Sequence, residues 1–107
     1  MERLTKNKRR MIEVLYRAAP EALYGLEISR LANIPSGSLY PALRSLRKAG
    51  IIHAEWRTPD DDPDGQPLRF YELTPNGFAL AKGLNEGKVE GSAWRQFLPA
   101  APGWELR

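Results

Sequence analysis

Residues 22–50 read ALYGLEISRLANIPSGSLYPALRSLRKAG and predict two short helices joined by a tight turn. Asn33-Ile34-Pro35 ends the first helix, because the residue before a proline is pushed out of the helical region. The second helix is expected to start at Ser36, whose hydroxyl is suited to cap a backbone N–H, and to stop at Gly50. Apolar residues of the first helix are expected to share its core-facing side: Leu26, Ile28, Leu31 and Ala32.

The second helix combines an apolar side with a cationic one. Arg44 and Lys48 lie one turn apart, so they share a face. Two short helices around a tight turn are the layout of a helix-turn-helix, whose second helix lies in the major groove of DNA. The residues expected to face the core are spaced by three and four: Leu39, Ala42, Leu43 and Leu46.

The flanking segments extend this unit on both sides. Thr5 is suited to cap a first helix that runs to about Ala19, with an apolar stripe at Met11, Ile12, Leu15, Tyr16 and Ala19. After Gly50 the pattern changes to alternation over residues 51–57 and 68–73, around the loop TPDDDPDGQP. Thr74-Pro75 then predicts the start of a helix that ends near Asn85.

The predicted fold is mainly α with a small β-hairpin, a winged helix-turn-helix of order α-α-α-β-β-α. Residues 1–85 are expected to form this winged-helix DNA-binding domain. Residues 86–107 contain three glycines and two prolines and are expected to form a weakly ordered tail. Its apolar side chains could dock at a dimer interface: Trp94, Phe97, Trp104 and Leu106.

Composition excludes several classes of protein. The 107 residues suit one small domain, and the absence of cysteine excludes disulfides and cysteine zinc sites. No apolar run has the roughly 20 residues of a membrane span, and the N-terminus lacks the apolar part of a signal peptide, so a cytoplasmic protein is expected. Residues 1–57 hold 11 Lys/Arg and 5 Asp/Glu, whereas residues 58–107 hold 5 and 8. The helix-turn-helix therefore lies in the basic half, as expected for contact with phosphates.

The order of these features resembles the PadR family of transcriptional regulators. The resemblance covers about Leu23 to Leu84 and rests on the motifs Tyr24-Gly25-x-Glu27-Ile28, Gly37-Ser38-Leu39-Tyr40-Pro41-Ala42-Leu43-x-x-Leu46, Gly50-x-Ile52 and Gly65-x-Pro67-x-Arg69-x-Tyr71-x-Leu73-Thr74-x-x-Gly77. It implies a winged-helix homodimer that binds operator DNA, mostly as a repressor, and a response to a small aromatic or drug-like inducer. Family members usually continue into a long C-terminal dimerisation helix, which is expected to be short here.

The candidate DNA contacts lie in the second helix of the motif and in the wing: Ser36, Ser38, Tyr40, Arg44, Lys48, Gln66 and Arg69. Arginine can read guanine through two parallel hydrogen bonds, and lysine offers a point charge to phosphate. Each has a structural alternative. Tyr40 could instead pack on the preceding helix, Arg44 and Lys48 could form a solvated cationic face, and Arg69 could pair across the hairpin with Glu55 or with the wing aspartates.

Catalysis and metal binding are poorly supported. No Ser/His/Asp set, phosphate-binding glycine loop or metal-ligand spacing is present, so no cofactor is expected. The wing acids Asp60, Asp61, Asp62 and Asp64 lack the spacing and the terminal glutamate of a calcium loop. His53, the only histidine, is expected to be structural or solvated. The alternative function is a winged-helix module for protein–protein contact through the acidic wing and the aromatic tail.

Overall fold

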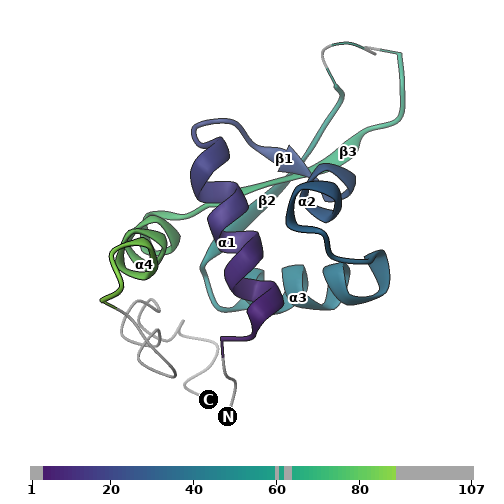
Figure 1. Ribbon diagram of the computed structural model, residues 1–107. Coiled ribbons are helices and arrows are strands. Elements are labelled where there is room, and N and C mark those ends of the chain that lie inside the picture. The colour runs from purple at the N-terminus through teal and green to yellow at the C-terminus, as the bar shows by residue number, and fades with distance from the viewer. Residues whose placement is uncertain (1–3, 60, 62–63, 89–107) are drawn as a thin grey trace, which may run out of the picture.

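The computed structural model describes residues 4–59, 61 and 64–88. Its elements are α1 (Lys6–Ala18), β1 (Leu23–Tyr24), α2 (Gly25–Ala32), α3 (Ser36–Lys48), β2 (Ile52–Arg57), β3 (Leu68–Leu73) and α4 (Pro75–Asn85). This arrangement confirms the predicted winged helix-turn-helix and adds one strand, β1, that the sequence did not predict. Figure 1 shows α1 crossing between the other helices, with the β2–β3 hairpin extending beyond the helical body.

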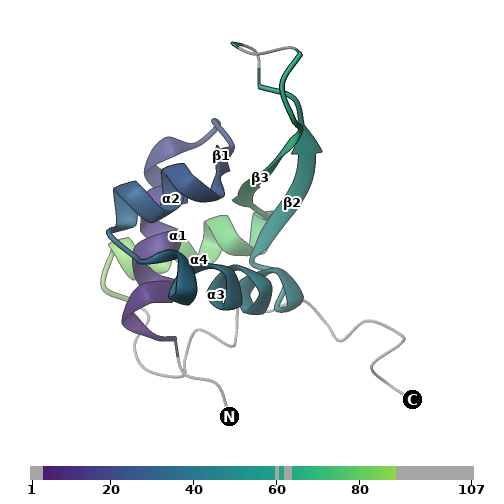
Figure 2. The same cartoon turned by 90° about the vertical axis from the view of Figure 1, so that its right-hand side faces the viewer.

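The sheet is antiparallel, with β3 between β1 and β2. Leu23 pairs with Tyr71 in the central strand, and Ile52 pairs with Leu73 at the base of the hairpin. β1 leads directly into α2, so the strand ties the helix-turn-helix to the wing. Figure 2, turned by 90°, shows β2 and β3 rising together past the end of β1.

The core forms where α1 meets the other helices and the sheet. As predicted, Met11, Ile12 and Leu15 are buried, with at most 1% of their surface exposed. Thr5 caps α1, since its Oγ1 accepts a hydrogen bond of 3.2 Å from the N–H of Lys8. The predicted core face of α3 is also confirmed, because Leu39, Ala42, Leu43 and Leu46 are all buried.

The predicted core face of α2 was partly wrong. Leu26 and Leu31 are 56% and 64% exposed, whereas Ile28 and Ala32 are buried together with Gly25. These three residues are spaced by three and four, so they form one side of the helix, and the two leucines flank it. The small glycine and alanine let α2 lie close to its neighbours.

The predicted cap of α3 was also wrong. Pro35, not Ser36, occupies the N-cap position, and no side chain caps this helix. Pro35 is extended, and its carbonyl accepts hydrogen bonds of 3.0 Å from the N–H groups of Ser38 and Leu39. Ser36 is therefore the first helical residue. The predicted stop at Gly50 is confirmed by its positive φ of 77°.

Helix α4 is fixed tightly to the start of the hairpin. Thr74 caps it, accepting from the N–H of Gly77 at 3.0 Å and donating to the Gly50 carbonyl at 2.6 Å. A Cβ at Gly77 would lie only 2.1 Å from the Ile51 carbonyl oxygen, so the absence of a side chain permits this contact. Within the described ranges, no helix is long and apolar enough to cross a membrane.

Candidate nucleic-acid interface

Helix α3 presents one continuous exposed face to solvent. Gly37, Pro41, Arg44 and Lys48 are spaced by four, three and four residues and all are exposed. The buried leucines lie on the other side of the helix, at most 1% exposed. The prediction that Arg44 and Lys48 share an exposed face is therefore confirmed. Ser36 and Ser38 are exposed beside this stripe.

Tyr40 packs on the preceding helix and is also half-exposed. Its side chain is 49% exposed, on the flank of α3 that faces the hairpin. Its ring also packs against the start of α2, because a Cβ at Gly25 would lie 2.6 Å from the Tyr40 hydroxyl oxygen. The phenol is thus held in place at one side and open to a partner at the other.

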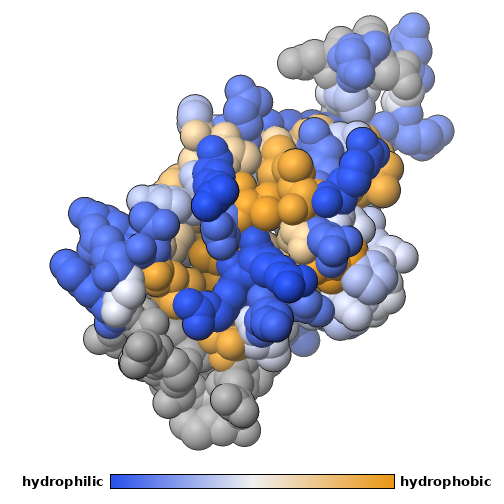
Figure 3. Space-filling model, viewed as in Figure 1, coloured by the Kyte–Doolittle hydropathy of each residue, from blue (hydrophilic) through white to orange (hydrophobic). Residues whose placement is uncertain are grey.

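Lys8 links α1 to α3 through a buried contact. Only 8% of its surface is exposed, and its Nζ donates a hydrogen bond of 2.9 Å to Ser45 Oγ. The spacing of Lys8 from Ile12 and Leu15 places it on the apolar side of α1. The other cations of that turn, Lys6, Arg9 and Arg10, are exposed. Figure 3 shows hydrophilic side chains gathered over α1.

Arg69 lies on β3 opposite Trp56 of β2, and its guanidinium carbon is 5.5 Å from the centre of the Trp56 ring. The alternative pairing with Glu55 is wrong, because Glu55 immediately precedes Trp56, points to the other side of the hairpin and accepts from Arg57 there. Among the described residues, the Arg69 Nε is buried without a hydrogen-bond acceptor. Gln66 is exposed in the segment before β3.

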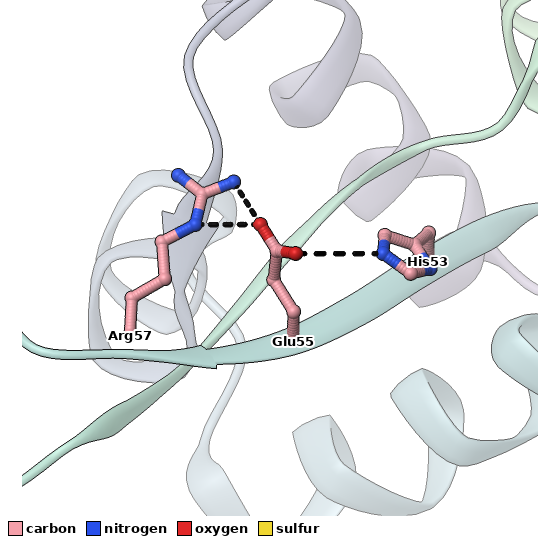
Figure 4. A network of polar contacts seen from close by, with 3 residues as sticks. All are labelled: His53, Glu55 and Arg57. Carbon is pink, nitrogen blue, oxygen red and sulfur yellow. Dashed lines mark hydrogen bonds and ion pairs between the residues drawn. The ribbon is translucent and has the colours of Figure 1, made fainter.

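The opposite side of β2 carries a row of ionisable side chains (Figure 4). Arg57 Nε donates to Glu55 Oε1 at 2.6 Å, and His53 Nε2 lies 3.8 Å from Glu55 Oε2. The hydrogen bond and charge of Arg57 lower the pKa of Glu55 below its ordinary value. The Arg57 guanidinium also lies 5.6 Å from the centre of the Phe70 ring. Arg57 is thus engaged within the hairpin.

A groove separates the start of α3 from the wing. Its volume is about 620 Å³, and its walls include the exposed rings of Tyr40 and Trp56 with Leu26 and Arg69. Burial at the base of this groove raises the pKa of the Tyr71 phenol above its ordinary value. The groove therefore offers apolar walls and one arginine beside the exposed face of α3.

Only two of the four wing aspartates lie within the described residues. Asp61 and Asp64 are exposed, and the other two wing aspartates, Asp60 and Asp62, lie outside the described residues. No group of three potential metal ligands occurs in the part of the chain that the structure describes. The predicted aromatic tail also lies outside the described residues from position 89 onward.

Residues 14–82 match the sequence profile of the Transcriptional regulator PadR-like family. The chain belongs to this family. Its members are transcriptional regulators and not enzymes. A comparison with curated proteins finds no match.

Solved structures show the same fold at low sequence identity. A PadR family transcription regulator from Clostridium difficile R20291 superposes with a TM-score of 0.62 at 18% identity, covering 73% of this PadR-like chain and 84% of the other. A PadR family transcriptional regulator from Eggerthella lenta DSM 2243 gives 0.57 at 21%, covering 76% and 73%. The circadian clock associated protein Pex from Anabaena gives 0.59 at 20%, covering 77% and 76%.

Proposed function

We propose that this PadR-like regulator binds specific sequences of duplex DNA through α3 and represses transcription. The observation that carries the proposal is the exposed face of α3, where Arg44 and Lys48 stand on a helix whose opposite side is anchored in the core. The second helix of a helix-turn-helix lies in the major groove, so this face would meet base edges. Repression would follow from occupancy, because a regulator seated on a promoter excludes other proteins from it.

The exposed side chains suit different parts of a DNA duplex. Ser36, Ser38 and Tyr40 lie in the leading half of α3, which contacts bases and phosphates in this docking mode. Arg44 would read a guanine edge, and Lys48 would contact a phosphate. In the wing, Gln66 and Arg69 would reach the minor groove or its phosphates. The position of the Arg69 guanidinium over the Trp56 ring, at the wall of the groove, supports this role, since a guanidinium there can donate to a phosphate oxygen.

A fluorescence anisotropy titration against a library of genomic fragments tests the proposal. Saturable, salt-sensitive binding that prefers some fragments over others is the expected result. If no fragment is bound, DNA binding is ruled out and the protein-contact module becomes the better interpretation. A promoter fused to a reporter gene then tests repression. If the protein is a repressor, reporter output should be lower when the protein is present.

Lys48→Ala is expected to weaken binding to all fragments by a similar factor. Removing one phosphate contact should lower the slope of log K against log salt by about 1. The substitution is at an exposed position, so thermal melting should match that of the unmodified protein. Titrations at several salt concentrations measure the slope. An unchanged slope would remove Lys48 from the interface.

We also propose a homodimer, because one recognition helix reads only a few base pairs and this class of protein pairs its half-sites by two-fold symmetry. Helices α1 and α4 lie side by side, and Tyr16 and Phe78 form an edge-to-face pair with ring centres 6.2 Å apart. Phe78 remains 39% exposed. This α1–α4 surface, with the tail of residues 86–107, would form the interface.

Sedimentation at micromolar concentration, with and without residues 86–107, is expected to show a dimer that weakens when the tail is removed. The physical reason is that α4 ends at Asn85, which leaves a small helical interface. A palindromic DNA fragment should restore the dimer in the truncated protein by bringing two copies together. Monomers in both proteins, even on that fragment, would exclude the homodimer.

The remaining parts of the proposal concern the inducer and the compartment. An aromatic inducer bound in the groove between Tyr40 and Trp56 would occupy the space beside α3 and displace DNA. We propose that the protein works in the cytoplasm, with residues 1–85 as the DNA-binding domain. Release of labelled DNA by a candidate inducer, measured in the same anisotropy assay, tests the first part.

A further inference from the structure

Gly37 is a glycine that the fold itself does not explain. It lies in helical backbone inside α3, and a Cβ built on it meets no atom within 4 Å. Other glycines have an internal reason: a Cβ at Gly25 would lie 2.6 Å from the Tyr40 hydroxyl oxygen, and Gly87 has a φ of 72°. Glycine lowers the stability of a helix relative to alanine. In the part of the chain that the structure describes, no contact at position 37 requires glycine and so offsets the lower helix stability.

The side chains on the exposed face of α3 differ in length along the helix. Gly37 and Pro41 occupy its first half and carry no long side chain, whereas Arg44 and Lys48 occupy its second half. Ser36 and Ser38, on either side of Gly37, are also short. The first half of the face therefore carries only short side chains, whereas the second half carries long cationic ones. A bulky partner can approach the main chain closely only at the end with short side chains.

We infer that Gly37 is the point of closest approach between α3 and DNA, where an added side chain would push the duplex away. The inference rests on the proposed DNA binding and names a residue that acts through the absence of a side chain. Close approach at this point brings base edges within reach of the short hydroxyls of Ser36 and Ser38. Their hydrogen bonds require donor and acceptor within about 3 Å of each other.

The test measures stability and DNA affinity for Gly37→Ala and Gly37→Leu. Because a Cβ at this position meets nothing, both variants should fold, and the alanine variant should melt at or above the temperature of the unmodified protein. The affinity for the preferred fragment should fall by about tenfold for alanine and by more for leucine. A stability that rises while affinity falls separates close approach from a role in folding.

The salt dependence of DNA affinity allows Gly37→Ala to be compared with Lys48→Ala, a variant on the same face of α3. Gly37→Ala adds bulk and removes no charge, so its slope of log K against log salt should stay unchanged, whereas that of Lys48→Ala should fall. If both Gly37 variants bind as tightly as the unmodified protein, the inference is overturned and the proposed function stands. Melting well below the unmodified protein would reveal an internal role for Gly37 and would also overturn it. Failure of the unmodified protein to bind any fragment overturns both proposals.

Discussion

Gly77→Ala is expected to lower the free energy of unfolding by about 3 kcal/mol or more, the upper range for overpacking a core. The added methyl group would lie 2.1 Å from the Ile51 carbonyl oxygen and 3.1 Å from the Leu73 side chain. The Ile51 oxygen also accepts from the N–H of Thr74 at 3.0 Å, so the backbone there has little freedom to move. Relief requires α4 to shift away from the hairpin, which breaks the hydrogen bonds that Thr74 donates to the Gly50 and Ile51 carbonyls.

Urea unfolding followed by circular dichroism measures this loss. Gly37→Ala is the matched control, because the same methyl group meets no neighbour there. The control should change the free energy of unfolding by about 1 kcal/mol at most, toward greater stability. Equal unfolding midpoints for the two variants would show that the contact between Gly77 and Ile51 does not constrain α4.

Arg44→Ala is expected to weaken binding to the preferred fragment by about 1–3 kcal/mol, which is the contribution of a good bidentate contact to base discrimination. Arg44 lies on the exposed face of α3, one turn before Lys48 and away from the core. A guanidinium there can donate two parallel hydrogen bonds to guanine O6 and N7. Non-specific fragments should lose much less, because this contact depends on the base.

Anisotropy titrations with the preferred fragment and with a scrambled fragment give both losses. Arg44→Lys is the informative control, since it keeps the charge and removes the two-pronged geometry. It should resemble Arg44→Ala on the preferred fragment and the unmodified protein on the scrambled one. If the lysine variant binds both fragments normally, Arg44 contacts only phosphate or solvent.

The helices and the hairpin could be predicted because each has a strong local signal. Thr5 and Thr74 predict where α1 and α4 begin, and the change from helical spacing to alternation locates β2. β1 has only two residues, Leu23 and Tyr24, and a strand this short has no period to detect. Its existence depends on pairing with β3, more than forty residues away in the chain.

Errors arose where a residue's environment depends on its neighbours in space. Leu26 and Leu31 resemble core residues in sequence, but in a helix of eight residues the close packing of Gly25 and Ala32 decides which side faces inward. The Arg69 partner depended on the register of the hairpin, which sets Trp56 opposite it. Arg44 and Lys48 could be placed on an exposed face from spacing alone, whereas their contacts with DNA, like those of Gln66 and Arg69, stay predictions.

The contact between Tyr40 and Gly25 limits how far the proposed DNA specificity could be transferred to another protein. Tyr40 of α3 lies against Gly25 at the start of α2, where a Cβ would come within 2.6 Å of the tyrosine hydroxyl oxygen, so a larger residue at position 25 would displace the ring. A graft of residues 36–48 onto a related scaffold would therefore need a glycine at the acceptor position equivalent to Gly25. During evolution the two sites would be expected to change together.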